Sequence, residues 1–286
     1  MKKIIYFIEF LLVEFLFIIC KVIGYKSASN LGFFIGTNFG NFFRKKKSII
    51  ENLRKSKIAI NIPDNQFVNN ILGNYGRILA EYPFLKDFRK NNLDHFIKID
   101  GVENLDKIKN NKKPVVFISG HFNNFELMAM QIEKHGINLA AIYRPLNNIF
   151  LNKTMERIRT KYICRNQIRK GRSGTRQILE NLKKGNSIAL MIDQRVTEGI
   201  KIDFFGNLAS TTTIPAQIIK KYECDLVPIY IERLEKYNFK MYVSQPITID
   251  SEKSQEKISE HLNSILEKMI LKNPDQWIWT HNRWKK

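Results

Sequence analysis

The stretch Pro114–Glu126, with the sequence PVVFISGHFNNFE, constrains the fold of this chain most strongly. The short apolar run between Pro114 and Gly120 is typical of a buried β-strand. Asn123 and Asn124 are suitable helix N-cap residues, and the apolar positions that follow predict the start of a helix. A buried strand that leads through a short turn into a helix indicates an α/β protein.

This turn carries two residues suited to acid–base chemistry, His121 and Glu126. On one continuous helix, residues five apart point roughly 140° away from each other. Because His121 lies on the turn before the helix, its imidazole can fold back toward Glu126. A carboxylate that orients an imidazole produces a general base. The sequence therefore predicts His121 as a general base oriented by Glu126; a structural histidine and a first-turn carboxylate favoured by the helix dipole are the alternatives.

Apolar runs and helical patterns alternate along the rest of the chain. Residues 139–143, 187–192 and 226–231 are typical of strands, and residues 240–249 of a late strand. Helical patterns cover 49–92 and 254–271, whereas the polar, glycine-containing segment 24–48 is expected to be a connector. This alternation predicts an α/β fold with a mixed central sheet flanked by helices, in a single domain over residues 24–286.

Residues 1–23 are predicted to form an N-terminal membrane anchor helix. The apolar stretch 4–20 follows Lys2 and Lys3, and with Val22 and Ile23 it reaches about 20 residues. About fifteen apolar residues at about −0.4 kcal/mol each compete with Glu9 and Glu14 at about +2.5 kcal/mol each, so insertion is only slightly favourable. A spanning helix is the first expectation, and a helix lying in the membrane interface is the alternative.

The charge of the chain narrows the choice of partners. There are 47 Lys+Arg against 27 Asp+Glu, which gives +20 at pH 7. Such an excess favours nucleic acid, an anionic membrane surface, phosphorylated lipid or an acidic protein. The basic residues follow no nucleic-acid recognition motif, so we expect no nucleic-acid partner, although a basic nucleic-acid-binding protein is the alternative from another class. The odd number of cysteines argues against a disulfide framework and favours reduced, cytoplasmic thiols.

Four further residues are candidates for substrate binding. Arg144 follows an apolar run, so it is expected at a strand end, where it could bind a phosphate or stabilise an oxyanion. Arg159 lies in the most basic region, where an acidic protein or a phosphorylated lipid would dock; a solvated surface is the alternative for both arginines. Asp193 and Gln194 follow the 187–192 strand and are expected to line the site. No ligand spacing and no Gly-rich phosphate loop occurs, so we expect neither metal nor cofactor.

Five blocks, in this order along the chain, together resemble the bacterial lipid A late acyltransferases, the lauroyl/myristoyl transferase family. They are GHFNNFE at 120–126, YRPLNN at 143–148, DQR at 193–195 leading to Gly199, FFG at 204–206 with Ala209 and Thr211–Thr213, and NPDQWIWTHNRW at 273–284. The family more often has Gly-Asn-Trp-Glu at positions 123–126 and His-Arg-Arg-Trp at 281–284. Both departures leave His121 and Glu126 in place.

The resemblance implies a glycerolipid-acyltransferase-like fold attached to the bacterial inner membrane, with the catalytic domain facing the cytoplasm. It implies transfer of a fatty acyl chain from acyl carrier protein to a hydroxyl of a lipid A precursor. The implied partners are acyl carrier protein, a phosphorylated glycolipid acceptor and the anionic inner membrane; a lysophospholipid or another glycolipid is the alternative acceptor. The chain has no Gly-x-Ser-x-Gly elbow and no thiol near a histidine in sequence, which favours direct transfer without an acyl-enzyme.

Overall fold

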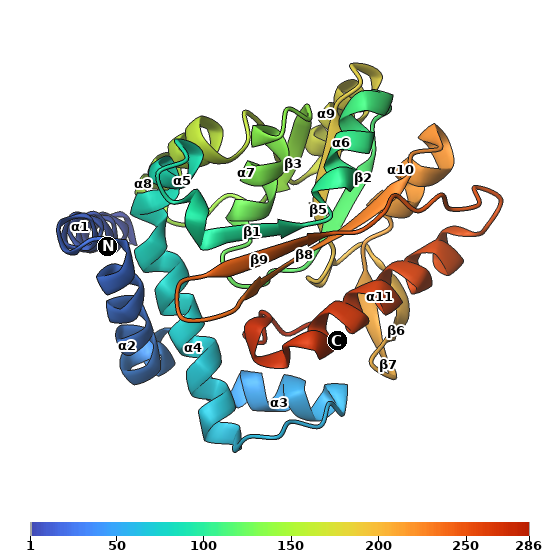
Figure 1. Ribbon diagram of the computed structural model, residues 1–286. Helices are drawn as coiled ribbons and strands as arrows, with labels where there is room; N and C mark the ends of the chain where they lie inside the picture. Colours follow the sequence, from blue (N-terminus) through green and yellow to red (C-terminus); the bar gives the residue numbers. More distant parts are fainter. Residues whose placement is uncertain (1, 286) are drawn as a thin grey trace.

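The computed structural model describes residues 2–285, which are built around a mixed seven-stranded sheet with helices on both sides (Figure 1). All neighbouring strands are parallel except the antiparallel pair β8–β9. In sheet order the strands are β1 (Ile97–Asp100), β9 (Phe239–Val243), β8 (Leu226–Arg233), β2 (Val116–Ser119), β5 (Ser187–Met191), β3 (Leu139–Tyr143) and β4 (Asn166–Arg169). An antiparallel hairpin of β6 (Ile200–Phe204) and β7 (Asn207–Thr211) stands apart from this sheet.

Helices cover both faces of the sheet, and α1, α2 and α4 lie beyond one end of it (Figure 1). In Figure 1, α6 and α7 lie on one side of the sheet and α11 on the other. The α-helices are α1 (Lys2–Ile23), α2 (Tyr25–Phe43), α3 (Lys46–Ser56), α4 (Asp64–Glu81), α5 (Leu85–Arg89), α6 (Val102–Asn111), α7 (Glu126–Lys134), α8 (Ile149–Ile158), α9 (Arg172–Lys183), α10 (Ile214–Tyr222) and α11 (Gln255–Lys272). Short helical turns cover Tyr82–Phe84, Asp94–Phe96 and Pro274–Gln276, and a π-helix covers Arg159–Ile163.

The α/β fold with a mixed sheet is confirmed, and the predicted strands at 139–143, 187–192 and 226–231 correspond to β3, β5 and β8. The central strand β2 is short, and every one of its residues is buried, so it is covered on both faces. That pattern is what covering helices on both sides of a parallel sheet require. The three cysteines are buried and unpaired.

The expectation of a connector over residues 24–48 is wrong, because most of it forms helix α2. Its glycines allow close contact with α4: a Cβ built on Gly36 would lie 2.2 Å from the Leu72 carbonyl oxygen. A Cβ on Gly76 would lie 1.9 Å from the carbonyl oxygen of Gly32. The polar, glycine-rich composition therefore serves helix–helix packing and not a loop.

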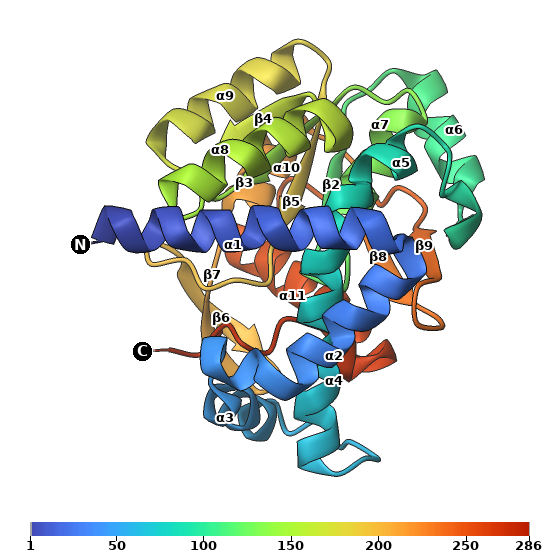
Figure 2. The same cartoon turned by 90° about the vertical axis from the view of Figure 1, so that its left-hand side faces the viewer.

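Helix α1 lies across one face of the domain, as Figure 2 shows. Among the residues that the structure describes, no helix combines the length and the apolar content needed to cross a membrane. The spanning helix expected from the sequence is therefore not supported. The acids that weakened that expectation are turned toward the domain, where Asn148 donates to Glu9 at 3.0 Å and Thr154 to Glu14 at 3.0 Å.

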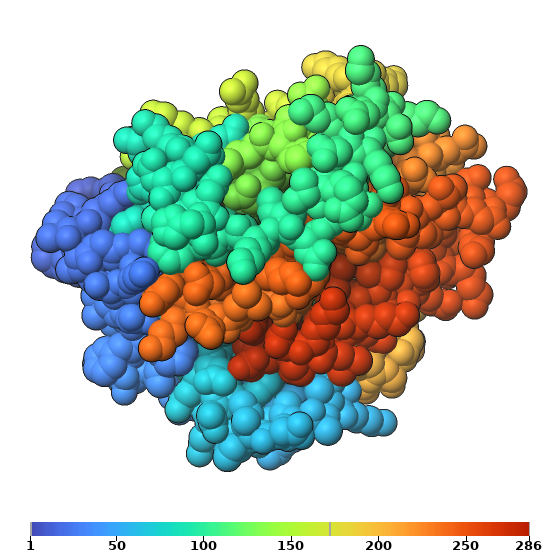
Figure 3. Space-filling view, viewed as in Figure 1, coloured from blue at the N-terminus to red at the C-terminus, as the bar shows by residue number. Residues whose placement is uncertain are grey.

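The C-terminal part of the chain packs against early helices. The segment that follows α11 contacts α4, and Asn52 of α3 donates to the carbonyl oxygens of Trp279 and His281. The space-filling view shows residues of the last helix lying directly against those of α3 and α4 (Figure 3). Segments separated by about 200 positions therefore form one continuous wall, to which the site described below belongs.

Candidate active site

Three neighbouring parallel strands bring the candidate residues to one edge of the sheet. His121 follows β2, Asp193 follows β5 and Arg144 follows β3, and these strands are adjacent in the order β2–β5–β3. The register pairs Ser119 of β2 with Met191 of β5, so the residues two positions later leave the sheet side by side. The carboxyl ends of parallel strands are where ligand sites of open α/β sheets lie.

His121 and Asp193 form the central pair of this site. The Nδ1 atom of His121 lies 2.8 Å from Oδ1 of Asp193, and the His121 backbone N–H donates to Oδ2 at 2.7 Å. The first contact holds the proton of a neutral imidazole on Nδ1 and leaves Nε2 as the basic nitrogen. The His121 side chain retains 19% exposure, whereas that of Asp193 has none. This is the arrangement of a general base with its orienting carboxylate.

Asp193 is ionised despite its burial. Burial acts to raise the pKa of its carboxyl, but the His121 imidazole and the hydrogen bonds from His121 lower it more, so the pKa lies below its ordinary value. Trp277 adds a hydrogen bond from Nε1 to Oδ2 at 2.9 Å. Three donors thus fix the carboxylate, and a fixed negative charge stabilises the imidazolium that forms when His121 takes a proton.

Glu126 does not occupy the place predicted for it. Its carboxylate accepts a hydrogen bond from the Tyr82 hydroxyl and forms a salt bridge with Arg159 at 2.7 Å. The predicted contact with His121 is therefore replaced by Asp193. Burial acts to lower the pKa of Arg159, but the Glu126 charge raises it above its ordinary value, so Arg159 is charged. Arg159, which we expected to bind substrate, instead forms a salt bridge with Glu126 at the start of α7.

The remaining predicted residues are placed differently from one another. Gln194 lies beside the base, with its Nε2 atom 3.5 Å from Nε2 of His121. Arg144 is exposed at the end of β3, and its charge, after burial, contributes to lowering the pKa of Lys170. Asp193, Gln194 and His121 are thus brought together, while Arg144 lies farther along the same sheet edge. Within residues 2–285, no group of three or more His, Cys, Asp or Glu side chains is arranged to hold a metal ion.

A small pocket of about 30 Å³ opens beside His121. It lies between α4 and the C-terminal segment, and its lining is mainly apolar. Besides His121, the walls include Ile71, Tyr75, Ile78, Phe125 and Ile278. The pocket therefore places apolar surface directly beside the imidazole of His121.

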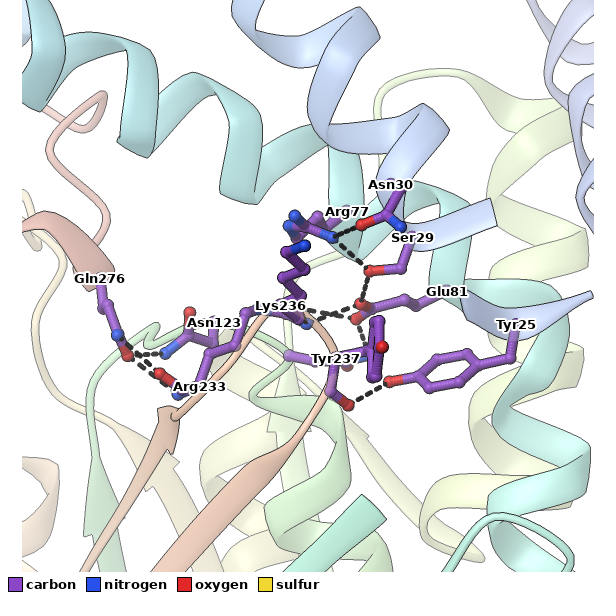
Figure 4. Close-up of polar contacts among 11 residues, drawn as sticks. Tyr25, Ser29, Asn30, Arg77, Glu81, Asn123, Arg233, Lys236, Tyr237 and Gln276 are labelled. Carbon is purple, nitrogen blue, oxygen red and sulfur yellow. Dashed lines mark hydrogen bonds and ion pairs between the residues drawn. The ribbon is translucent and has the colours of Figure 1, made fainter. Parts of the chain in front are cut away.

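A buried polar network supports the turn that carries His121 (Figure 4). Glu81 is fully buried and accepts two hydrogen bonds from Arg233, at 2.7 and 3.0 Å. The same carboxylate accepts from Asn124 at 3.1 Å. Gln276 connects the backbone of Arg233 to the side chain of Asn123, whose backbone φ is +42°. A non-glycine residue keeps a positive φ only when its surroundings hold the backbone in that conformation. Here hydrogen bonds fix both asparagines of the turn, Asn123 and Asn124.

Sequence reasoning missed two aromatic contacts at this site. Trp277, Trp279 and Trp284 are all buried and pack over the core. Trp277 supports Asp193, and His281 accepts a hydrogen bond from the backbone N–H of Arg195 at 2.9 Å. The clustering of Trp and His after α11 was the available signal for these contacts.

Comparison with known proteins identifies the family. The family model described as bacterial lipid A biosynthesis acyltransferase matches residues 1–286. A lipid A biosynthesis palmitoleoyltransferase of Escherichia coli (strain K12) is 22% identical over 265 residues, covering 88% of this chain and 84% of the relative. A lipid A biosynthesis lauroyltransferase of the same organism is 24% identical over 196 residues, covering 66% of this chain and 61% of the relative. This chain is an acyltransferase and belongs to the bacterial lipid A biosynthesis acyltransferase family.

Proposed function

We propose that this protein transfers a fatty acyl chain from an acyl thioester of acyl carrier protein to a hydroxyl of a lipid A precursor. The observation that carries the proposal is the His121–Asp193 pair, whose imidazole lies beside a small, mainly apolar pocket at the carboxyl edge of the sheet. The family supports an acceptor of the lipid A type, because the relatives are named for lipid A biosynthesis. The donor and the roles of individual residues are our assignments.

In the proposed reaction His121 acts as general base through Nε2. The acceptor hydroxyl replaces the long contact of Gln194 with Nε2 and gives its proton to the imidazole. The hydroxyl oxygen attacks the thioester carbonyl, and a tetrahedral oxyanion forms. The C–S bond then breaks, and the imidazolium returns the proton to the leaving thiolate. Asp193 stabilises the imidazolium throughout, while Glu126 and Arg159 hold the start of α7.

The charge distribution suggests how the two substrates dock. Arg144 and Lys170 follow the neighbouring strands β3 and β4 and are suited to a phosphate of the glycolipid acceptor. The overall charge of +20 favours the acidic carrier protein and an anionic membrane surface. A catalytic domain on the cytoplasmic side of the inner membrane fits these partners.

We also propose that α1 lies in the membrane interface. Its exposed residues include Leu12 and Phe15, each 63% exposed, while Glu9 and Glu14 bond to the domain. The polar side of the helix is thus satisfied by protein, and the apolar side is free for lipid. A helix with this distribution binds parallel to the membrane surface. The exposed lysines at its N-terminal end, Lys2 and Lys3, complement anionic head groups.

The test is acyl transfer from a set of acyl carrier protein donors to a tetra-acylated lipid A precursor. We expect His121→Ala and Asp193→Asn each to lower kcat at least about a hundredfold. His135 and Asp106 form a matched surface pair, with Nε2 of His135 also 2.8 Å from Oδ1 of Asp106. His135→Ala and Asp106→Asn should therefore leave kcat unchanged.

The alternatives give distinct results. Wild-type rates in His121→Ala would remove the proposed base, and wild-type rates in Asp193→Asn would remove its orienting group. If the wild type acylates a lysophospholipid and not the lipid A precursor, the proposed acceptor is wrong. Salt-sensitive DNA binding without any acyl transfer would instead support the nucleic-acid alternative.

A further inference from the structure

His281 lies beside the candidate site but outside the reacting atoms. Its Nε2 accepts a hydrogen bond from the backbone N–H of Arg195 at 2.9 Å. Arg195 directly follows Gln194 and Asp193, the two residues that contact His121. One imidazole thus fixes the position of the loop that presents the orienting carboxylate.

His281 is itself held firmly from two sides. Its backbone N–H donates to the carbonyl oxygen of Ile278, and its own carbonyl oxygen accepts from Asn52 of α3 at 3.0 Å. The neighbouring Thr280 hydroxyl lies 2.8 Å from that of Tyr75 on α4. The imidazole therefore connects the 193–195 loop to a rigid part of the fold.

We propose that His281 is a positioning residue that must be neutral for acyl transfer, because only a neutral imidazole can accept the Arg195 N–H and hold Asp193 against His121. This inference rests on the proposed function. Protonation would turn the accepting Nε2 of His281 into an N–H donor that faces the N–H of Arg195. The 193–195 loop would then lose this hydrogen bond.

The surroundings of His281 are consistent with this requirement. Burial lowers the pKa of His281, Asp193 acts in the opposite direction, and His121, Arg283 and Lys170 add to the lowering. Arg195 itself, from the loop, and the neutral Tyr75 hydroxyl complete the titratable groups near this segment. The net effect keeps His281 neutral at pH 7, and only acidification below its ordinary pKa of about 6.5 protonates it.

The test compares pH profiles of kcat/KM for the wild type, His281→Gln and His281→Ala. The wild type should lose activity on the acid side with a slope approaching two, because both His121 and His281 must be unprotonated. A glutamine amide oxygen can accept the Arg195 N–H and does not titrate, so His281→Gln should be active near pH 8 and show a slope of one. His281→Ala should lower kcat/KM about tenfold or more at pH 8, since the N–H is left unpaired. His261→Gln, an exposed histidine on α11, is the matched control and should follow the wild type.

A second measurement does not depend on activity. Amide hydrogen exchange at Arg195 should be slow in the wild type and in His281→Gln, and faster in His281→Ala. An acid slope that is the same in the wild type and in His281→Gln overturns the proposal, as does unchanged exchange in His281→Ala. If the wild type transfers no acyl group to any acceptor, the proposed function fails, whereas the exchange result still decides whether His281 holds the loop.

Discussion

Asp193 and Glu126 divide two tasks that the sequence assigns to one residue. Asp193 orients the imidazole, while Glu126 neutralises a largely buried arginine; the side chains of Arg159 and Glu126 are 13% and 8% exposed. A carboxylate beside His121 and one beside Arg159 have different consequences when removed. Loss of the first affects proton transfer, and loss of the second leaves a charge without its partner.

The role of Glu126 predicts a change in stability. Glu126→Gln should lower the free energy of unfolding by about 3 kcal/mol, because the Arg159 charge loses its partner. The double variant Glu126→Leu with Arg159→Met should recover much of that loss, since no unpaired charge remains. Urea unfolding followed by circular dichroism measures both.

The exposed Arg176–Glu180 pair on α9 provides the control, with side chains 86% and 49% exposed. Glu180→Gln should change the free energy of unfolding by less than about 0.5 kcal/mol. An unchanged urea midpoint in Glu126→Gln together with a large loss of kcat would contradict the structural role and return Glu126 to the neighbourhood of the base.

At the scale of single elements, the sequence predicts best where the pattern is local. Strands β3, β5 and β8 follow directly from their apolar runs. Helix α2 was not predicted, because its glycines become informative only when they face Gly73 and Gly76 of α4. The His121–Asp193 pair depends in the same way on β2 and β5 being neighbours, although His121 and Asp193 are 72 positions apart and other strands lie between β2 and β5 in sequence. Closeness in sequence pointed to Glu126 as the carboxylate beside His121, whereas the order of the strands places Asp193 there.

The contact between α2 and α4 predicts that added methyl groups on α2 will lower stability by amounts that depend on how close α4 lies. Gly36→Ala should lower the free energy of unfolding by about 1–3 kcal/mol, because the new Cβ would meet the Leu72 carbonyl oxygen at 2.2 Å. Gly40→Ala on the same helix is the control, since its Cβ would lie 3.1 Å from a side-chain atom. Because Ala favours helix over Gly by about 1 kcal/mol, Gly40→Ala should be neutral or slightly stabilising. Equal thermal midpoints for the two variants would mean that the close contact is not limiting.

At the scale of the whole molecule, we expect the apolar side of α1 and the net positive charge of the protein to favour the same partner, an anionic membrane surface. The helix lies along one face of the domain, with its acids bonded to Asn148 and Thr154 (Figure 2). Because these acids are satisfied by the domain, binding parallel to a bilayer surface does not require their transfer into hydrocarbon. The face presented by α1 is therefore the side from which we expect lipid substrates to arrive.

Binding to vesicles tests this orientation. Leu12→Glu together with Phe15→Glu should lower the fraction of protein that floats with phosphatidylglycerol–phosphatidylcholine vesicles at least about tenfold, because a charge replaces apolar surface at the lipid contact. Leu234→Glu is the control; Leu234 is 49% exposed on the turn between β8 and β9. Equal flotation of the double variant and the wild type would exclude α1 as the lipid-binding surface.

The wall formed by the C-terminal segment has a consequence for biosynthesis. Gln276, which holds Asn123, lies 153 positions after it in the chain. A ribosome must therefore translate that whole distance before the turn bearing His121 receives its final support. Since chain synthesis proceeds from the N-terminus, α1 is complete well before the segment that supports the turn of His121 has been translated. If α1 binds the membrane as we propose, attachment precedes activity, and acyl transfer begins only after the enzyme has reached its lipid substrate.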